Sequence, residues 1–161
     1  MYFIIKQKEG FIMNTKSLIT EVFTDMESGK FEKANALLAD DFRALLLGKE
    51  VNRPMYMSAI RCIRQGIPDL KLSIENVKTD GNKVTAKVKI TGTNSHAIPA
   101  LMKGFQEIPA TNKKVDGLLA DLEITLKDGK IEEIRNVKNT RGMFVSLLEN
   151  LGLDYKKFQE N

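Results

Sequence analysis

Polar side chains follow apolar ones on the same face of a predicted strand over residues 84–93. Apolar residues occupy every second position from Val84 to Ile90, and the same alternation then reaches Asn94 and His96. Residues two apart lie on one face of a strand. We therefore predict that a core-facing surface ends in a cluster of polar groups, as the wall of a ligand pocket does.

The last predicted strand, over residues 131–138, supplies two charged candidates. If it pairs with the strand over residues 113–126, Glu133 and Arg135 face the concave side of the sheet. Arg135 then suits an anionic ligand, because a guanidinium binds carboxylate or phosphate in bidentate fashion, and Glu133 acts as a base or orients the ligand. The alternative is a structural ion pair between the two. A bulge or a one-residue slip would exchange the two faces of the strand.

Three further side chains are candidates for the same pocket. His96 follows a strand end, and its ordinary pKa of about 6.5 suits proton transfer. Asn94 shares its face and can bind a ligand carbonyl. Tyr56 can place a hydroxyl at the pocket mouth. The alternatives are a surface or hydrogen-bonded structural histidine and a core tyrosine.

Composition excludes several classes of protein. The net charge of +4 is mild and the lysines are scattered, whereas nucleic-acid binding needs a basic patch with interleaved aromatic residues. The single cysteine, Cys62, and the single histidine do not give a metal-ligand spacing. No apolar run has the length of a membrane span. We expect a cytoplasmic protein that binds neither nucleic acid nor membrane and uses no metal or other cofactor.

The predicted elements place helices first, strands next and one helix last. Helices are predicted over residues 15–28, 31–39, 53–65 and 143–151, and strands over residues 42–47, 70–77, 84–93, 113–126 and 131–138. Asn14 and Thr15 are good caps for the first helix and Asn52 for the third. A bulge is expected near Gly117, and Asp128-Gly129 is a hairpin turn. Segregated helices and strands indicate an α+β domain.

One domain accounts for residues 13–153, followed by a polar tail over residues 154–161. Residues 1–12 are predicted to be a non-native or disordered extension. Lys8-Glu9-Gly10 can be encoded by a purine-rich ribosome-binding sequence, so we expect translation to begin at Met13. The alternative is a genuine but poorly tethered tail.

Five short motifs occur in a characteristic order along the chain. They are Ile67-Pro68-Asp69-Leu70, Asp80-Gly81-Asn82-Lys83-Val84, Thr91-Gly92-Thr93, Pro109-Ala110-Thr111-Asn112-Lys113-Lys114-Val115 and Asp128-Gly129-Lys130-Ile131-Glu132-Glu133. In this order the chain resembles SnoaL-like polyketide cyclases of the nuclear-transport-factor-two-like superfamily. The resemblance implies a cone-shaped α+β fold, in which a strongly bent antiparallel sheet wraps the N-terminal helices and encloses a pocket. It also implies a homodimer.

The chain departs from the resemblance at the position of the cyclases' acidic residue, which is Asn139 here. An amide cannot transfer a proton as a carboxylate does, so standard cyclase chemistry is not expected. We predict a protein that binds a small apolar molecule, anionic or carbonyl-bearing, through Asn94, Arg135, Asn139 and Tyr56. The alternatives are an isomerase, cyclase or lyase that uses His96 or Glu133 for proton transfer, and a dimeric scaffold without a ligand.

Overall fold

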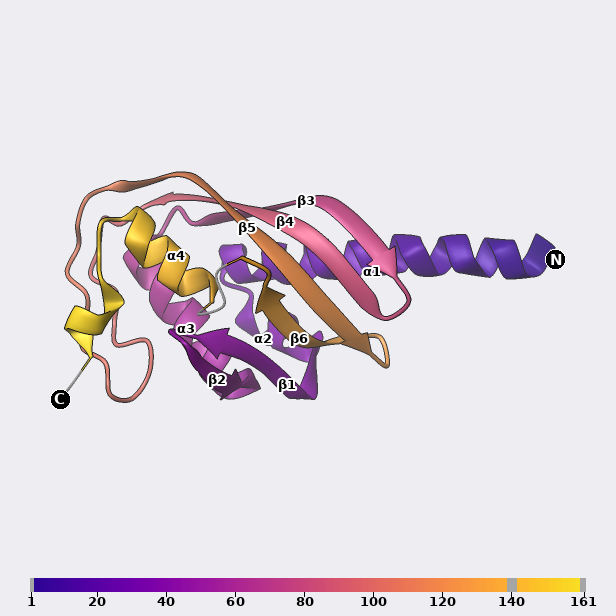
Figure 1. Cartoon of the computed structure of the whole chain (residues 1–161), viewed down its shortest axis with the longest axis horizontal. Helices are drawn as coiled ribbons and strands as arrows, with labels where there is room; N and C mark the ends of the chain where they lie inside the picture. Colours follow the sequence, from indigo (N-terminus) through magenta and orange to yellow (C-terminus); the bar gives the residue numbers. More distant parts are fainter. Residues whose placement is uncertain (1, 139–141, 160–161) are drawn as a thin grey trace.

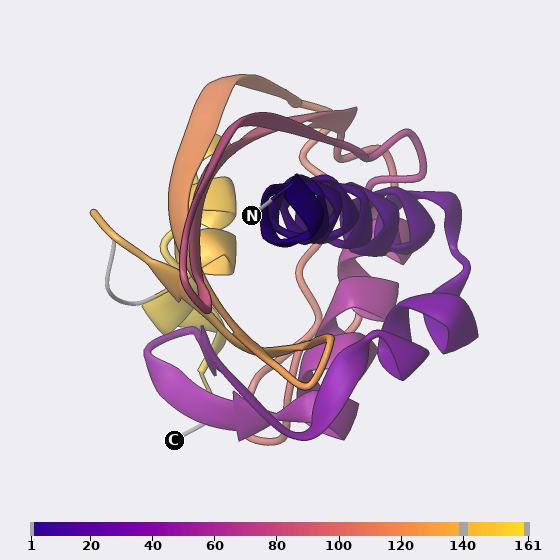
Figure 2. The ribbon, with the colours of Figure 1, turned by 90° about the vertical axis from the view of Figure 1, so that its right-hand side faces the viewer.

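A curved sheet wraps around a long helix in the computed structural model, which describes residues 2–138 and 142–159. In chain order the elements are α1 (Tyr2–Ser28), α2 (Phe31–Ala36), β1 (Leu38–Leu46), β2 (Lys49–Asn52), α3 (Arg53–Gly66), β3 (Lys71–Asp80), β4 (Lys83–Thr93), β5 (Lys114–Lys127), β6 (Lys130–Asn136), α4 (Met143–Asn150) and the 3-10 helix η1 (Tyr155–Phe158). The six strands have the order β2-β1-β6-β5-β4-β3 (Figure 1). The end-on view shows α1 within the curve of the strands (Figure 2). The predicted α+β cone is therefore confirmed.

Helix α1 is held by an apolar stripe at helical spacing. Ile19, Val22, Phe23 and Met26 are completely buried, as expected for the core-facing side of an amphipathic helix. The sequence predicts that this helix begins at Asn14 or Thr15. In the structure it begins earlier, at Tyr2. Residues 2–13 contain no proline, the residue that most strongly breaks a helix. Its N-terminal part projects past the end of the sheet (Figure 1). Among the described helices, none combines the length and apolar composition needed to cross a bilayer.

The segment between α2 and α3 differs from the prediction. Helix α2 ends at Ala36, three residues early, and β1 begins at Leu38. The short strand β2 was not predicted. Only Val51 of its four residues is buried, so no apolar alternation marks it in the sequence. Strand β1 pairs antiparallel with β2 and parallel with β6, which makes the sheet mixed.

Helix α3 begins as its sequence predicts. The side chain of Asn52 accepts a hydrogen bond from the backbone N–H of Met55 at 3.1 Å, which satisfies one of the donors left free in the first turn. Pro54 lies in that turn, where its missing N–H removes no helical hydrogen bond. Tyr56, Ala59, Ile60 and Ile63 form the buried face that packs into the cone.

The hairpins of the sheet also follow the predicted turns. Asp128 and Gly129 adopt φ angles of 51° and 76° in the turn between β5 and β6. The predicted bulge at Gly117 is confirmed, because the pairing of β4 with β5 shifts there. Beyond the bulge, the even-numbered residues of β5 face the core, including Leu122 and Ile124. The concave face is thus apolar along the length of this strand.

Candidate functional site

Glu133 and Arg135 lie on the outer face of the sheet rather than in the cone. The pairing of β5 with β6 shifts by one residue between Ile131 and Glu133. Glu132 is therefore an extra residue, and a bulge of this kind exchanges the faces of every residue that follows it. The inward positions of β6 become Ile131 and Ile134, both buried. The predicted inward orientation of Glu133 and Arg135 is wrong for this reason.

The charges on this outer face form ion pairs at the surface. Arg135 Nε lies 3.4 Å from Glu133 Oε1, and Arg43 Nη1 lies 3.3 Å from Glu50 Oε1. The four side chains line a shallow depression of about 300 Å³. Arg135 is 61% exposed and Glu133 34% exposed, so both charges reach water. This arrangement matches the structural ion pair that the sequence left open as the alternative.

Removing this pair is expected to cost little stability. Replacing Arg135 with Met, which keeps an unbranched side chain, is expected to change the free energy of unfolding by less than about 0.5 kcal/mol, because exposed ion pairs contribute about 0–1 kcal/mol. Urea unfolding of Arg135→Met and of the matched variant Glu133→Gln measures the change. A loss above about 2 kcal/mol in either variant would contradict the assignment of the pair to the surface.

His96 lies in the loop after β4 and is exposed. Its Nδ1 is 3.0 Å from the hydroxyl oxygen of Ser95, and its backbone N–H donates to the carbonyl of Gly66 at 3.3 Å. Within the described part of the chain, no hydrogen bond or ion pair joins His96 to Glu133 or Arg135. The predicted convergence of these three groups on one chamber is therefore wrong.

Asn94 is fully buried and its side chain is saturated by protein partners. Its Nδ2 donates to the carbonyls of Gly66 and His96, at 3.2 and 2.8 Å. Its Oδ1 accepts from the backbone N–H and the hydroxyl of Thr111, at 3.0 and 2.9 Å. An amide has two donor hydrogens and two acceptor lone pairs. The predicted bond to a ligand carbonyl would therefore have to replace one of these contacts, and the structure gives Asn94 a structural role.

Tyr56 is a core residue, which is the alternative that the sequence left open. It is 3% exposed, and its ring packs against Phe42 and Phe144 with centroid distances of 5.1 and 6.1 Å. Burial raises the pKa of the Tyr56 hydroxyl, so the group stays protonated throughout the physiological range. The remaining predicted ligand-binding residue, Asn139, lies outside the described residues.

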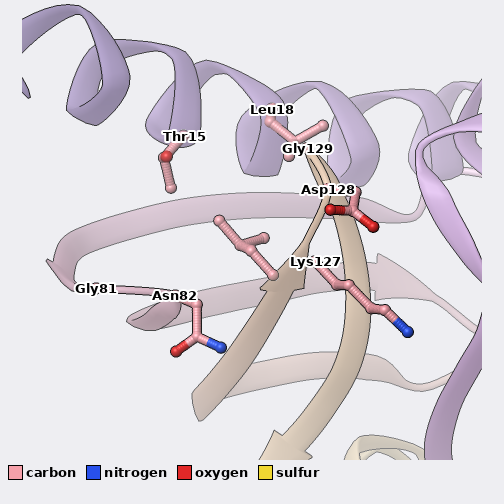
Figure 3. A pocket seen from close by; sticks show the side chains of 8 residues that line it. Thr15, Leu18, Gly81, Asn82, Lys127, Asp128 and Gly129 are labelled. Atoms are coloured by element: carbon pink, nitrogen blue, oxygen red, sulfur yellow. The ribbon is translucent and has the colours of Figure 1, made fainter. Parts of the chain in front are cut away.

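A pocket of about 460 Å³ opens where α1 passes the tips of two hairpins (Figure 3). Three segments line it: Thr15 and Leu18 of α1, Gly81 and Asn82 of the β3–β4 turn, and residues Leu126, Lys127, Asp128 and Gly129 at the β5–β6 turn. Thr15 and Leu18 are three residues apart and so share one side of the helix. The backbone N–H of Leu126 donates to the carbonyl of Asn82 at 2.8 Å, which holds the two hairpin tips together.

Among the residues of the pocket lining that the structure describes, Lys127 is the only cation, and it is already paired. Lys127 Nζ lies 3.1 Å from Asp41 Oδ2 and 3.5 Å from Glu132 Oε2. The hydrogen bond that Lys127 donates to Asp41, with the charges of Asp41 and Glu132, raises the pKa of Lys127, and the same bond lowers the pKa of Asp41. Leu18 and Leu126 therefore offer apolar contact, and Thr15 and Asn82 offer neutral hydrogen-bonding groups. This lining suits an uncharged ligand better than an anionic one.

The reasoning from sequence did not place a site at this end of the sheet, although two signals point to it. Both hairpin turns, at Asp80-Gly81 and at Asp128-Gly129, are evident in the sequence. Because β4 pairs antiparallel with β5, both turns must lie at the same end of the sheet. The position of α1 against that end depends on tertiary packing. Among the described residues, no group of three His, Cys, Asp or Glu side chains gathers to hold a metal ion.

The strand order, the curvature and the enclosed helix define an α+β cone. The chain belongs to the SnoaL-like polyketide cyclase family, whose model matches residues 17–146. This match confirms the resemblance found in the sequence motifs. No curated protein matches the chain.

Solved structures with the same fold share little sequence with this chain. A candidate SnoaL-like polyketide cyclase from Jannaschia sp. CCS1 is 18% identical, with a TM-score of 0.66 over 88% of this chain and 94% of that one. TsrD from Streptomyces laurentii is 18% identical, with a TM-score of 0.63 over 87% and 96%. A candidate ketosteroid isomerase from Kribbella flavida is 16% identical, with a TM-score of 0.53 over 77% and 76%. At these identities the likeness establishes the fold alone.

Proposed function

We propose that the protein binds a small, mostly apolar, uncharged molecule in the pocket between α1 and the two hairpin turns. The observation that carries the proposal is the pocket of about 460 Å³, which is within the size range of small-molecule sites. Leu18 and Leu126 supply apolar contact, and the polar groups of Thr15 and Asn82 can orient the ligand. The names of the family and of the Kribbella protein, polyketide cyclase and ketosteroid isomerase, support a carbon-rich ligand with rings.

The alternative of an isomerase, cyclase or lyase is less well supported. This alternative requires His96 or Glu133 to transfer the proton. His96 lies on the connection between β4 and β5, and Glu133 lies on the outer face of the sheet. Neither lines the pocket between α1 and the hairpins. General acid–base catalysis needs a side chain within hydrogen-bond reach of the reacting group. The homodimer, the cytoplasmic location and the scaffold alternative stay predictions.

A charged side chain in the pocket is expected to weaken binding of an uncharged ligand. The test uses fluorescence titration with 2-methoxynaphthalene, an uncharged two-ring probe. Leu18→Arg is expected to weaken its binding by about tenfold or more, because the guanidinium would fill the site or hold water in it. Leu119→Arg is the matched control, since Leu119 is 52% exposed and is not among the pocket residues. The proposal fails if the wild-type protein does not bind the probe, or if both variants lose binding equally.

A further inference from the structure

Arg61 differs from the other arginines that the structure describes, because no described residue accepts a hydrogen bond from its guanidinium or forms an ion pair with it. Its partner is instead the ring of Phe31, whose centroid lies 4.9 Å from the guanidinium carbon. The other described arginines donate to a carboxylate or to a main-chain carbonyl; they are Arg43, Arg53, Arg64 and Arg135. A guanidinium that stacks on a ring keeps the N–H donors at its edge free for an anion. The donors of Arg61 are therefore available.

The ring that contacts Arg61 is anchored in the fold. Phe31 is the first residue of α2, is partly buried and packs against the hydrophobic core. The cation–π contact therefore restrains a long side chain that would otherwise sample many rotamers. Binding to a restrained side chain costs less conformational entropy than binding to a mobile one. Arg61 is thus a preorganised cation at the surface.

A pocket of about 550 Å³ lies beside this cation, between α2 and α3. Its lining consists of Phe31, Glu32, Asn35, Arg53, Pro54, Met57, Ser58 and Arg61. Pro54, Met57 and Arg61 recur at i, i+3 and i+7, so they share one side of α3 and place apolar surface next to the guanidinium. None of the lining residues belongs to the pocket between α1 and the hairpin turns, so the two sites are separate.

The charges of the lining favour a ligand with one negative charge. Arg53 is eight residues from Arg61, about 12 Å along the helix axis, and its Nη1 already lies 3.1 Å from Asp40 Oδ1. Arg61 is therefore the lining cation that no described carboxylate compensates. Glu32 is the only carboxylate among the described lining residues, and it is exposed. Its charge repels a doubly charged phosphate about twice as strongly as a carboxylate.

We propose that the pocket between α2 and α3 binds a small carboxylate with an apolar body. Arg61 holds the carboxylate through two parallel N–H···O hydrogen bonds, the geometry that a guanidinium matches best. Met57 and Pro54 contact the apolar body, and Asn35 and Ser58 offer neutral hydrogen-bonding groups. This second site does not depend on the proposed function, because it needs no ligand in the other pocket.

The test compares benzoate with benzamide, an uncharged molecule of nearly the same shape, by amide chemical-shift titration of ¹⁵N-labelled protein. The wild type is expected to bind benzoate about fivefold more tightly, with the largest shifts at Asn35, Ser58 and Arg61. In Arg61→Gln the two affinities should become equal. Arg43→Gln is the matched control and should keep the preference, because Arg43 is an exposed arginine on the outer face of the sheet that is paired with Glu50.

Glu32→Gln gives a prediction of the opposite sign. It removes the negative charge from the lining, so benzoate should bind about two- to threefold more tightly and benzamide with unchanged affinity. Four results would each overturn the inference: no benzoate binding to the wild type, equal affinities of the wild type for both probes, a preference that survives in Arg61→Gln, and weaker benzoate binding in Glu32→Gln. Binding of 2-methoxynaphthalene at the other pocket tests the proposed function separately.

Discussion

Replacing Asn94 with Ala is expected to lower the free energy of unfolding by about 3 kcal/mol. The substitution deletes the four side-chain hydrogen bonds of a completely buried residue. It leaves the carbonyl of His96 and the N–H of Thr111 without these partners. An unsatisfied buried group costs about 1–3 kcal/mol. Urea unfolding followed by circular dichroism measures the loss.

Asn82→Ala is the matched control for this prediction. Asn82 is exposed at the tip of the β3–β4 hairpin, and its backbone carbonyl, which the substitution keeps, accepts from the N–H of Leu126. Its truncation should change the free energy of unfolding by less than about 0.5 kcal/mol. If Asn94→Ala were as mild as the control, Asn94 would not hold this end of the fold together. Its amide would then be available for the ligand contact predicted from the sequence.

Gly92→Ala is expected to cost about 3 kcal/mol as well. Gly92 has a φ of 152°, a conformation that residues with a side chain rarely adopt. An added Cβ would overlap Cγ2 of Ile67 and lie 3.3 Å from the Cα of Leu70. Backbone strain and overpacking each cost about 1–3 kcal/mol. Thermal and urea unfolding both measure the effect.

Gly81→Ala separates the cost of backbone strain from the cost of overpacking. Gly81 also has a positive φ, of 61°, but a Cβ there would meet nothing within 4 Å. Only the backbone strain remains, so the expected cost is about 1 kcal/mol. Equal losses in Gly81→Ala and Gly92→Ala would contradict the contact of Gly92 with Ile67 and Leu70.

These contacts explain the motifs that carry the family resemblance. Ile67 and Leu70 belong to one motif and Gly92 to another, and the two motifs touch. Asp69 also accepts a hydrogen bond from the backbone N–H of Thr93 at 2.7 Å. Both motifs therefore serve the junction between α3, β3 and the end of β4. Such residues identify the fold, whereas the ligand site that we propose between α1 and the hairpin turns lies at the other end of the sheet.

Most of the fold was predictable because its signals are local. The period-two alternation in β4, the cap at Asn52 and the turn at Asp128-Gly129 each depend on neighbouring residues. The bulge at Glu132 was not predictable from the pattern. Glu132 and Glu133 are both charged, so either can face outward without exposing apolar surface, and the sequence does not show which of them is extra.

The candidate site was harder to predict because it depends on a bulge and on loop contacts that the local sequence pattern does not show. A single extra residue in β6 turned Glu133 and Arg135, the two charged candidates on that strand, to the outer face. The side chain of Asn94 faces inward, as predicted. Its Oδ1 atom, however, already accepts two hydrogen bonds from Thr111, in the loop beside it. Asp25 resembles an interruption of the apolar stripe of α1 in the sequence. Among the described residues its buried Oδ2 atom has no hydrogen-bond partner, and this appears only once the neighbouring elements are packed around it.

The most direct test of the account is the location of the bound probe. Addition of 2-methoxynaphthalene to ¹⁵N-labelled protein, followed by amide chemical-shift mapping, reports which residues surround it. We expect the largest shifts at Thr15, Leu18, Asn82 and Gly129, which line the pocket between α1 and the hairpin tips. Shifts concentrated instead around His96 or around Arg135 would place the ligand at the polar groups first indicated by the sequence, and would contradict the site proposed here.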